Sequence, residues 1–130
     1  MGNKCPIEST ISLINGKWKI LILKELSQGP VRYGKIGNHI PTISAKVLTQ
    51  QLREMVDDGL LVREVFAEIP PRVEYSLGEM GISLFTVFKE LRRWGLSEDK
   101  VHSVQCAYCK NCQPLWQVKQ QSVVVQESNQ

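Results

Sequence analysis

Apolar residues recur at spacings of three and four in several segments of the chain, and two short β-type runs interrupt this pattern. The helical spacing predicts helices at residues 6–14, 17–26, 32–39, 45–58 and 78–95. The runs 61–66 and 72–77 are typical of strands, and Pro70-Pro71 between them fits the tip of a hairpin. Beyond residue 95, Ser97 is expected to cap a further helix, and the chain ends in a Gln-rich stretch.

Helices followed by a hairpin and a long helix have the element order of a winged helix-turn-helix domain. We therefore expect a mainly α fold with a small β-hairpin (α+β). Residues 1–95 would form the winged helix-turn-helix domain, and residues 96–130 would form a carboxy-terminal helix or tail. The total of 130 residues suits one small domain with such a tail.

The predicted helix 45–58 has an apolar face for the core and a polar face opposite to it. The residues of the polar face are spaced at i, i+3, i+4 and i+7, so they share one side of the helix; they are Lys46, Thr49, Gln50 and Arg53. Lysine and arginine donate to guanine, glutamine pairs with adenine, and threonine contacts a phosphate or a thymine methyl. This helix is the expected recognition helix, and an ordinary amphipathic helix with a mixed polar face is the alternative.

The two ends of this helix would behave differently toward DNA. Ser44 is its expected N-cap, and the N–H groups of its first turn would face a phosphate. Glu54, Asp57 and Asp58 near the other end would repel DNA. We therefore expect contacts along the first turns only.

Three basic residues outside the recognition helix are candidates for further DNA contacts. Arg32 and Lys35 precede the helix, where they fit the DNA backbone. Arg72 lies in the hairpin, where it would reach a phosphate or the minor groove. Solvation is the alternative role of Arg32 and Lys35, and pairing with Glu68 or Glu74 is the alternative role of Arg72.

Positive charge is concentrated around the recognition helix. The segment 26–53 carries a charge of +4, because it holds four basic residues and no acidic one, whereas the whole chain has a net charge of +3. The rest of the chain is thus close to neutral. A local basic patch favours a polyanion as partner, although a solvated basic surface has the same composition.

Several motifs, taken together, resemble those of the HxlR-type winged helix-turn-helix transcriptional regulators, which are bacterial and archaeal relatives of the MarR group. The motifs run from residue 5 to residue 95 and comprise Cys5-Pro6-Ile7-Glu8, Gly16-Lys17-Trp18-Lys19-Ile20-Leu21-Ile22-Leu23, Val31-Arg32-Tyr33-Gly34-Lys35-Ile36, Ile43-Ser44-Ala45-Lys46-Val47-Leu48, Leu52-Arg53-Glu54, Asp58-Gly59-Leu60, Pro70-Pro71-Arg72-Val73-Glu74-Tyr75-Ser76-Leu77, Gly81 and Trp94-Gly95. One departure is Gly78, where the family usually has a threonine that would cap the next helix. That cap would pass to Ser76 or be weaker.

The resemblance implies a homodimer that binds double-stranded DNA at a palindromic operator and represses or activates a gene. Its long carboxy-terminal dimerisation helix would join the amino-terminal helix in the dimer interface. The two recognition helices would enter successive major grooves, about 34–36 Å apart. Several family members sense oxidants or electrophiles through a cysteine near the amino terminus, and Cys5 matches that position. An oxidant or a small molecule is therefore the expected inducer.

The four cysteines leave three interpretations open. Cys5 lies at a helix start, where the helix dipole favours a reactive thiolate, and its oxidation would alter the dimer. Cys106, Cys109 and Cys112 lie outside the family match and would hold zinc or an iron–sulfur cluster in a metal-responsive regulator, with Cys5 as the fourth ligand that both groups usually need. In the third interpretation Cys5 packs as a small apolar residue, the triplet is inert, and no cofactor is required.

Other classes of protein find less support in the sequence. His39 and His102 are isolated, and no Ser-His-Asp set or Gly-rich phosphate loop is present, so we expect no enzyme. A winged helix used only for protein contacts would not need an acid-free basic segment. The longest stretch without a charged residue, Ile36 to Ala45, is about half of what a membrane span needs. The amino terminus lacks the apolar core of a signal peptide, so we expect a cytoplasmic protein without a membrane partner.

Overall fold

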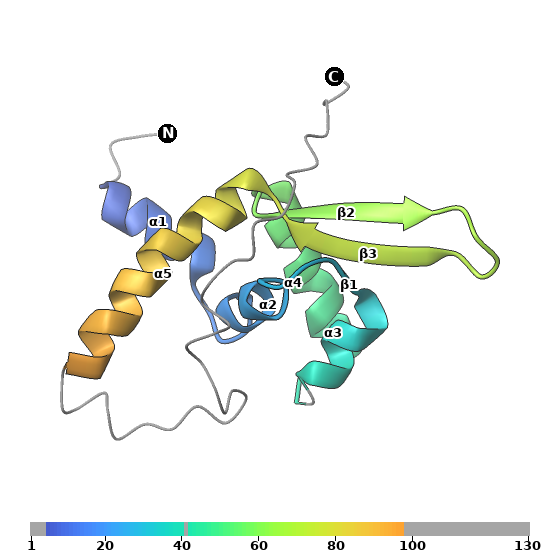
Figure 1. The fold of residues 1–130 in the computed structure, drawn as a ribbon, viewed down its shortest axis with the longest axis horizontal. Coiled ribbons are helices and arrows are strands. Elements are labelled where there is room, and N and C mark those ends of the chain that lie inside the picture. The colour runs from blue at the N-terminus through green and yellow to red at the C-terminus, as the bar shows by residue number, and fades with distance from the viewer. Residues whose placement is uncertain (1–4, 41, 98–130) are drawn as a thin grey trace.

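The computed structural model describes residues 5–40 and 42–97 (Figure 1). Their elements, in chain order, are α1 (Pro6–Ile14), α2 (Lys19–Glu25), β1 (Val31–Arg32), α3 (Tyr33–His39), α4 (Ala45–Asp57), β2 (Leu61–Phe66), β3 (Arg72–Leu77) and α5 (Glu79–Ser97). The fold is mostly helical with a small antiparallel sheet, as the sequence predicted. The two predicted hairpin strands match in full, and the ends of the predicted helices differ from those observed by at most two residues.

The sheet has three strands in the order β1-β3-β2, and both neighbouring pairs are antiparallel. Strands β2 and β3 form the hairpin, in register from Leu61 opposite Leu77 to Phe66 opposite Arg72. Strand β1 was not predicted, because two residues are too few for a periodicity to show. The backbone of Arg32 is extended and pairs with Glu74, so α3 begins at Tyr33 and not at Arg32.

The hydrophobic core lies between the helices and one face of the sheet. Its buried side chains come from α2, α3, α4, the hairpin and α5, and they include Ile22, Leu23, Ile36, Leu48, Leu52, Met55, Leu61, Tyr75, Leu77, Leu84, Phe85 and Phe88. Burying a side chain of this size stabilises a fold by about 1.5–3 kcal/mol. Because α4 and β2 contact each other and share this core, the hairpin is fixed relative to α4.

The turn between β3 and α5 brings two backbone segments close together. The carbonyl oxygen of Gly78 accepts a hydrogen bond from the N–H of Ile82 at 2.9 Å, so Gly78 precedes α5 as its cap residue. A Cβ atom at Gly78 would lie 2.8 Å from the carbonyl oxygen of Gly59, closer than real Cβ atoms come to a neighbour. A threonine would not fit here, and Ser76 stays inside β3 opposite Val62.

The end of α5 corrects one prediction. Ser97 is the last residue of α5, and its hydroxyl donates to the carbonyl oxygen of Trp94 at 2.7 Å. It therefore belongs to α5 and does not start a new helix, because α5 continues two residues past its predicted end. The further helix that we predicted, the Gln-rich end and the triplet Cys106, Cys109 and Cys112 lie outside the described residues.

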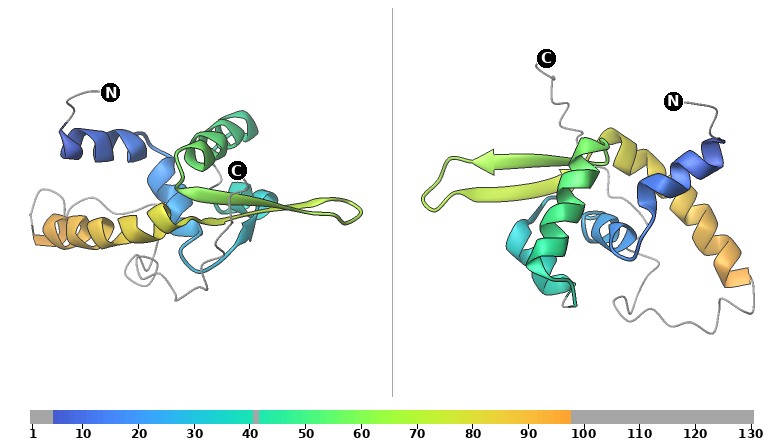
Figure 2. Two further views of the ribbon diagram at one scale, coloured as in Figure 1. Left: turned by 90° about the horizontal axis from the view of Figure 1, so that it is seen from above. Right: turned by 180° about the vertical axis from the view of Figure 1, so that it is seen from behind.

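The hairpin and the pair of helices α1 and α5 lie at opposite ends of the described domain (Figures 1 and 2). Helices α2, α3 and α4 lie between these ends in all three views. None of the helices within residues 5–40 and 42–97 is long and apolar enough to cross a membrane. The fold thus offers one end built on α4 and the hairpin and another built on α1 and α5.

Candidate nucleic-acid interface

Ser44 caps α4, as the sequence predicted. Its side-chain oxygen accepts a hydrogen bond from the N–H of Val47 at 3.2 Å, and its backbone is extended. Leu48, Leu52 and Met55 are the buried residues of this helix. They fix the rotation of α4, so that its opposite side points outward.

The outward side of α4 brings together the four side chains that the sequence assigned to the polar face of the recognition helix. Lys46, Thr49, Gln50 and Arg53 are all exposed, and we call them the α4 face. Arg32 and Lys35, in β1 and α3, are exposed as well. Within residues 5–40 and 42–97, none of the four basic residues in this set forms an ion pair. Their positive charge is therefore uncompensated and available to a polyanion.

Tyr33 fixes the α4 face to α3. Its hydroxyl donates to the carbonyl oxygen of Ala45 at 3.3 Å and lies 2.9 Å from Oγ1 of Thr49. When Tyr33 donates to Ala45, its oxygen accepts from Thr49, which orients the threonine hydroxyl. The sequence placed Tyr33 in a family motif without giving it a role. This contact joins residues 16 apart and depends on how α3 packs on α4, so only the motif could have pointed to it.

Lys19 compensates part of the negative charge that we expected at the far end of α4. Its ammonium nitrogen lies 3.1 Å from Oε2 of Glu54, and only 11% of its side chain is exposed. Glu54 is therefore a paired carboxylate that ties α4 to α2, and it repels DNA less than the sequence suggested. Asp57 and Asp58 remain exposed, so the acidic end of the helix begins later than predicted.

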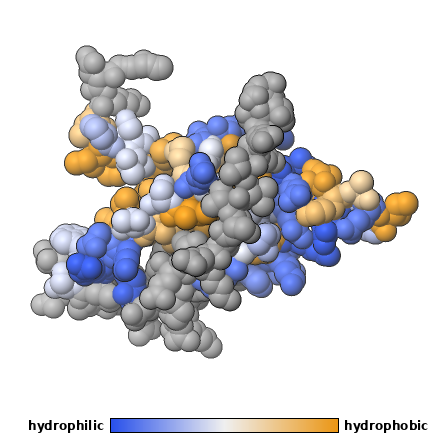
Figure 3. Space-filling view, turned by 45° about the horizontal axis from the view of Figure 1, so that its top comes forward, coloured by the Kyte–Doolittle hydropathy of each residue, from blue (hydrophilic) through white to orange (hydrophobic). Residues whose placement is uncertain are grey.

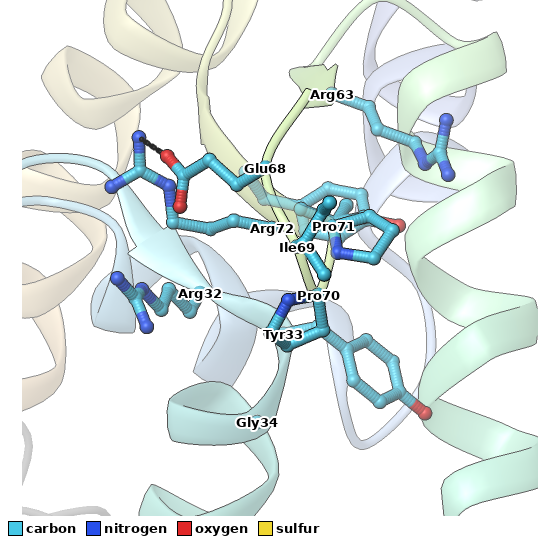
Figure 4. Close-up of a pocket in the computed structure, with 11 residues that line it drawn as sticks. Arg32, Tyr33, Gly34, Arg63, Glu68, Ile69, Pro70, Pro71 and Arg72 are labelled. Atoms are coloured by element: carbon cyan, nitrogen blue, oxygen red, sulfur yellow. Dashed lines mark ion pairs between the residues drawn. The ribbon is translucent and has the colours of Figure 1, made fainter. Parts of the chain in front are cut away.

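Arg72 is held within the hairpin by two carboxylates and an aromatic ring. Its guanidinium lies 3.0 Å from Glu68, 3.5 Å from Glu74 and 4.0 Å from the centre of the Phe66 ring. Figure 4 shows the pair with Glu68. The pairing that we gave as the alternative role of Arg72 is thus present. A DNA contact by Arg72 stays a prediction, and it would compete with these ion pairs.

An open cleft of about 510 Å³ lies between the hairpin and the start of α3 (Figure 4). Its lining includes Arg32, Tyr33, Arg63, Ile69, Pro70 and Tyr75. Because the Tyr33 hydroxyl also contacts α4, this cleft adjoins the α4 face.

Helices α1 and α5 expose apolar side chains that the domain itself leaves uncovered. The exposed apolar residues of α1 are Ile7 and Ile11, and those of α5 are Met80, Val87, Leu91 and Trp94. The four residues of α5 follow one another at intervals of seven, four and three, so they share one helix face. We call these six residues the α1/α5 stripe. Leu91 is 52% exposed and Trp94 is 61% exposed, although both follow the buried residues Leu84, Phe85 and Phe88 at helical spacing. Figure 3 shows apolar surface at this end of the molecule and again at the hairpin tip.

Cys5 stands directly before α1, next to the α1/α5 stripe. It is a free cysteine with an exposed side chain that forms no capping hydrogen bond. Within the part of the chain that the structure describes, no group of three or more His, Cys, Asp and Glu side chains is placed to hold a metal ion. The described residues therefore leave Cys5 as an accessible thiol, and the cysteine triplet lies beyond them.

The site has the parts of a winged helix-turn-helix protein. They are a capped helix with exposed basic and amide side chains, a preceding helix that is fixed to it, and an adjoining hairpin. A family model described as HxlR-like helix-turn-helix matches residues 13–102. The chain belongs to this family, which the motifs in its sequence already indicated. It is a transcriptional regulator of the helix-turn-helix type, and its relatives are regulators and not enzymes.

Three relatives illustrate the similarity. The uncharacterised HTH-type transcriptional regulator YdeP of Bacillus subtilis is 39% identical over 104 residues, which cover 79% of this chain and 81% of YdeP. The redox regulator HypR in its reduced form is 38% identical with a TM-score of 0.70, covering 77% of this chain and 100% of that chain. The reduced form of the regulator YodB from B. subtilis is 37% identical with a TM-score of 0.69, covering 75% and 96%. HypR has also been solved oxidised, and YodB diamide-treated and quinone-bound.

Proposed function

We propose that this protein is a homodimeric, sequence-specific DNA-binding regulator that binds a palindromic operator through its α4 face. The observation that carries the proposal is the α4 face itself, which is exposed, has no acidic partner within residues 5–40 and 42–97, and lies at a capped helix start. In each protomer Lys46, Gln50 and Arg53 would contact base edges, while Arg32 and Lys35 would contact phosphates. Whether such binding represses or activates depends on where the operator lies.

The second protomer would cover the α1/α5 stripe. Exposed apolar area costs about 25 cal/mol per Å² relative to burial, and the stripe includes side chains as large as Leu91 and Trp94. Two copies related by a twofold axis would bury the same surface on each. This arrangement would place the two α4 faces on half-sites one helical turn apart, about 34–36 Å.

An oxidant or an electrophile is the signal that we propose, with Cys5 as its sensor. The exposed Cys5 thiol beside the α1/α5 stripe supports this proposal, and so do the redox regulator HypR and the diamide-treated and quinone-bound forms of YodB. Diamide would take two electrons and two protons from Cys5 and a second thiol, which leaves a disulfide. A quinone would accept the Cys5 thiolate at a ring carbon and form a thioether adduct. Either product would shift the two protomers and misalign their α4 faces.

A metal-responsive regulator is the second candidate. It rests on the spacing of Cys106, Cys109 and Cys112, with Cys5 as a fourth ligand for zinc or for an iron–sulfur cluster. Metal analysis of protein purified without oxygen separates the two candidates. A full complement of zinc or iron would favour the metal-responsive regulator. If metal-free protein still binds its operator, DNA binding requires no metal cofactor.

Footprinting on the DNA upstream of the protein's own gene, with a selection from random sequence as a second source of sites, tests the proposed function. We expect a protected region with two symmetric halves about one helical turn apart, and loss of protection when diamide is added. Protection without twofold symmetry would contradict the homodimer. The absence of any preferred site in both experiments would contradict sequence-specific binding.

A further inference from the structure

Arg63 of β2 is a basic residue to which neither the sequence nor the proposed α4 contacts give a role. We propose that Arg63 binds a backbone phosphate of the DNA whose major groove receives α4, and that the cleft beside Tyr33 is the phosphate site. This inference rests on the proposed DNA binding and adds the residue that holds the DNA strand next to the hairpin. The charge pattern of the sequence does not single out Arg63, because the acidic residue Glu64 follows it directly and offsets its charge.

The register of the sheet places Arg63 on the side of the hairpin that faces α4. Arg63 lies opposite Tyr75, and directly opposed residues of a β-ladder lie on the same face. Leu61 and Leu77 lie two residues along each strand, so they share that face, and both are buried in the core that α4 helps to form. Arg63 itself is exposed. It therefore extends the α4-facing side of the hairpin beyond the edge of the core.

The other two arginines of the cleft belong to the opposite face of the sheet. Arg32 lies opposite Glu74, and Arg72 is two residues from Glu74, so all three share that face. Figure 4 shows the guanidinium groups of Arg32 and Arg72 on one side of the cleft, and Arg63 with the Tyr33 hydroxyl on the other.

Arg63 also differs from Arg72 in its partners. Two carboxylates hold the guanidinium of Arg72. Arg63 forms no ion pair with any residue of 5–40 or 42–97. Arg63 thus carries the one positive charge on the hairpin that is not already compensated among the described residues, and it lies on the side nearer to α4.

The dimensions of B-DNA bring a phosphate to this side of the hairpin. An α-helix about 10–12 Å across fills a major groove about 12 Å wide, so the phosphates that border the groove lie alongside the helix. A hairpin that packs on that helix meets the same phosphates. The cleft of about 510 Å³ has room for a phosphate group, and a guanidinium binds its oxygens through two parallel N–H bonds.

A DNA-binding titration tests this proposal. It measures the affinity of the full-length wild-type protein and of its Arg63→Gln variant for two duplexes of about three helical turns. One duplex is selected by the wild-type protein from a random pool, and the other has a mixed sequence. We expect Arg63→Gln to weaken binding to both duplexes by a similar factor, about tenfold for each protomer. The slope of log affinity against log salt should fall by about 0.9 for each protomer.

Two further variants and two further measurements make the test specific. Arg63→Lys should keep most of the salt slope, because it keeps the charge, while it loses the paired N–H bonds. Arg93→Gln is the matched control, since it removes an arginine that is 72% exposed on α5, and it should change neither affinity nor slope. Thermal unfolding of Arg63→Gln should match the wild type, because the side chain is exposed. Neutral methylphosphonates, placed at single positions of the selected duplex, should lower wild-type affinity at one position beside each half-site and leave Arg63→Gln insensitive there.

The outcomes separate this inference from the function on which it rests. If the wild-type protein prefers the selected duplex and Arg63→Gln has the same affinity and salt slope, the role of Arg63 is overturned and the proposed function stands. If the wild-type protein binds neither duplex, the proposed function and the phosphate role of Arg63 fail together. If it binds both equally, the sequence-specific function fails, and an unchanged salt slope of Arg63→Gln would overturn its phosphate role separately.

Discussion

Tyr33 and Lys19 lie outside α4, yet they determine how its side chains are presented. The hydroxyl of Tyr33 lies 2.9 Å from that of Thr49, and the ammonium of Lys19 lies 3.1 Å from the carboxylate of Glu54. The first contact orients a polar group on the exposed side of α4. The second compensates a negative charge near it. Both residues thus prepare α4 for a polyanion without being part of the helix.

Two substitutions at Ser44 separate the capping of α4 from its proposed phosphate contact. Ser44→Ala removes the acceptor for the N–H of Val47 and should lower the free energy of unfolding by about 1 kcal/mol, measured by urea denaturation. Ser44→Asp caps a helix equally well and should leave stability unchanged. Its negative charge should nevertheless weaken DNA binding in a titration. Equal DNA affinities of Ser44→Asp and the wild type would mean that no phosphate lies at the start of α4.

Residue roles that depend on local spacing could be predicted, and those that depend on a distant partner could not. Ser44 precedes a long periodic segment, so its capping role followed from its position. The exposure of Gln50 followed from its place opposite the buried leucines of α4. The contact of Tyr33 with Thr49, and the lack of an ion pair at Arg63 among the described residues, depend on how α3 and the hairpin pack on α4. No local pattern encodes that packing.

Among the elements, α5 has two apolar regions with different surroundings. Leu84, Phe85 and Phe88 are buried in the domain, whereas Leu91 and Trp94 near its end are exposed. All five residues lie at helical spacing, which does not distinguish burial within a domain from exposure on its surface, so the sequence pattern alone does not separate the two regions. Strand β1 is the converse case. Its two residues form a strand only because β3 offers them an edge with which to pair.

The proposed dimer predicts the effect of a charge in the α1/α5 stripe. Leu91→Glu places a carboxylate where the second protomer would pack, so it should convert the dimer to monomers in sedimentation experiments and weaken operator binding. Because Leu91 is 52% exposed within one domain, the Leu91→Glu monomer should still fold, and its thermal unfolding should remain cooperative. Lys89→Glu, at an exposed position on the opposite side of α5, is the control and should remain a dimer. A Leu91→Glu protein that stays dimeric would exclude this part of α5 from the interface.

The whole molecule separates its two proposed surfaces. The α4 face adjoins the hairpin, and the α1/α5 stripe lies with Cys5 at the other end of the domain (Figures 1 and 2). A modified Cys5 would therefore not touch the DNA held by its own α4. It would act through the relative position of the two protomers, which sets the distance between the two α4 faces.

A Cys5→Ser variant should bind the selected duplex with wild-type affinity and keep that affinity when diamide is added. The wild-type protein should be released by diamide and should bind again after reduction by dithiothreitol, because a disulfide is reversible. Fluorescence anisotropy of a labelled duplex follows both proteins. Release of Cys5→Ser to the same extent as the wild type would exclude Cys5 as the sensor.

One titration tests most directly whether the α4 face recognises DNA sequence. It compares the binding of the wild type with that of Lys46→Ala, Gln50→Ala and Arg53→Ala, on both the selected and the mixed-sequence duplex. We predict that each variant loses about 1–3 kcal/mol of binding free energy on the selected duplex. Gln50→Ala should bind the mixed-sequence duplex as the wild type does, because its amide carries no charge for phosphates. Lys89→Ala, at an exposed lysine of α5, should bind both duplexes as the wild type does. Unchanged binding of all three α4 variants to the selected duplex would show that α4 does not recognise DNA.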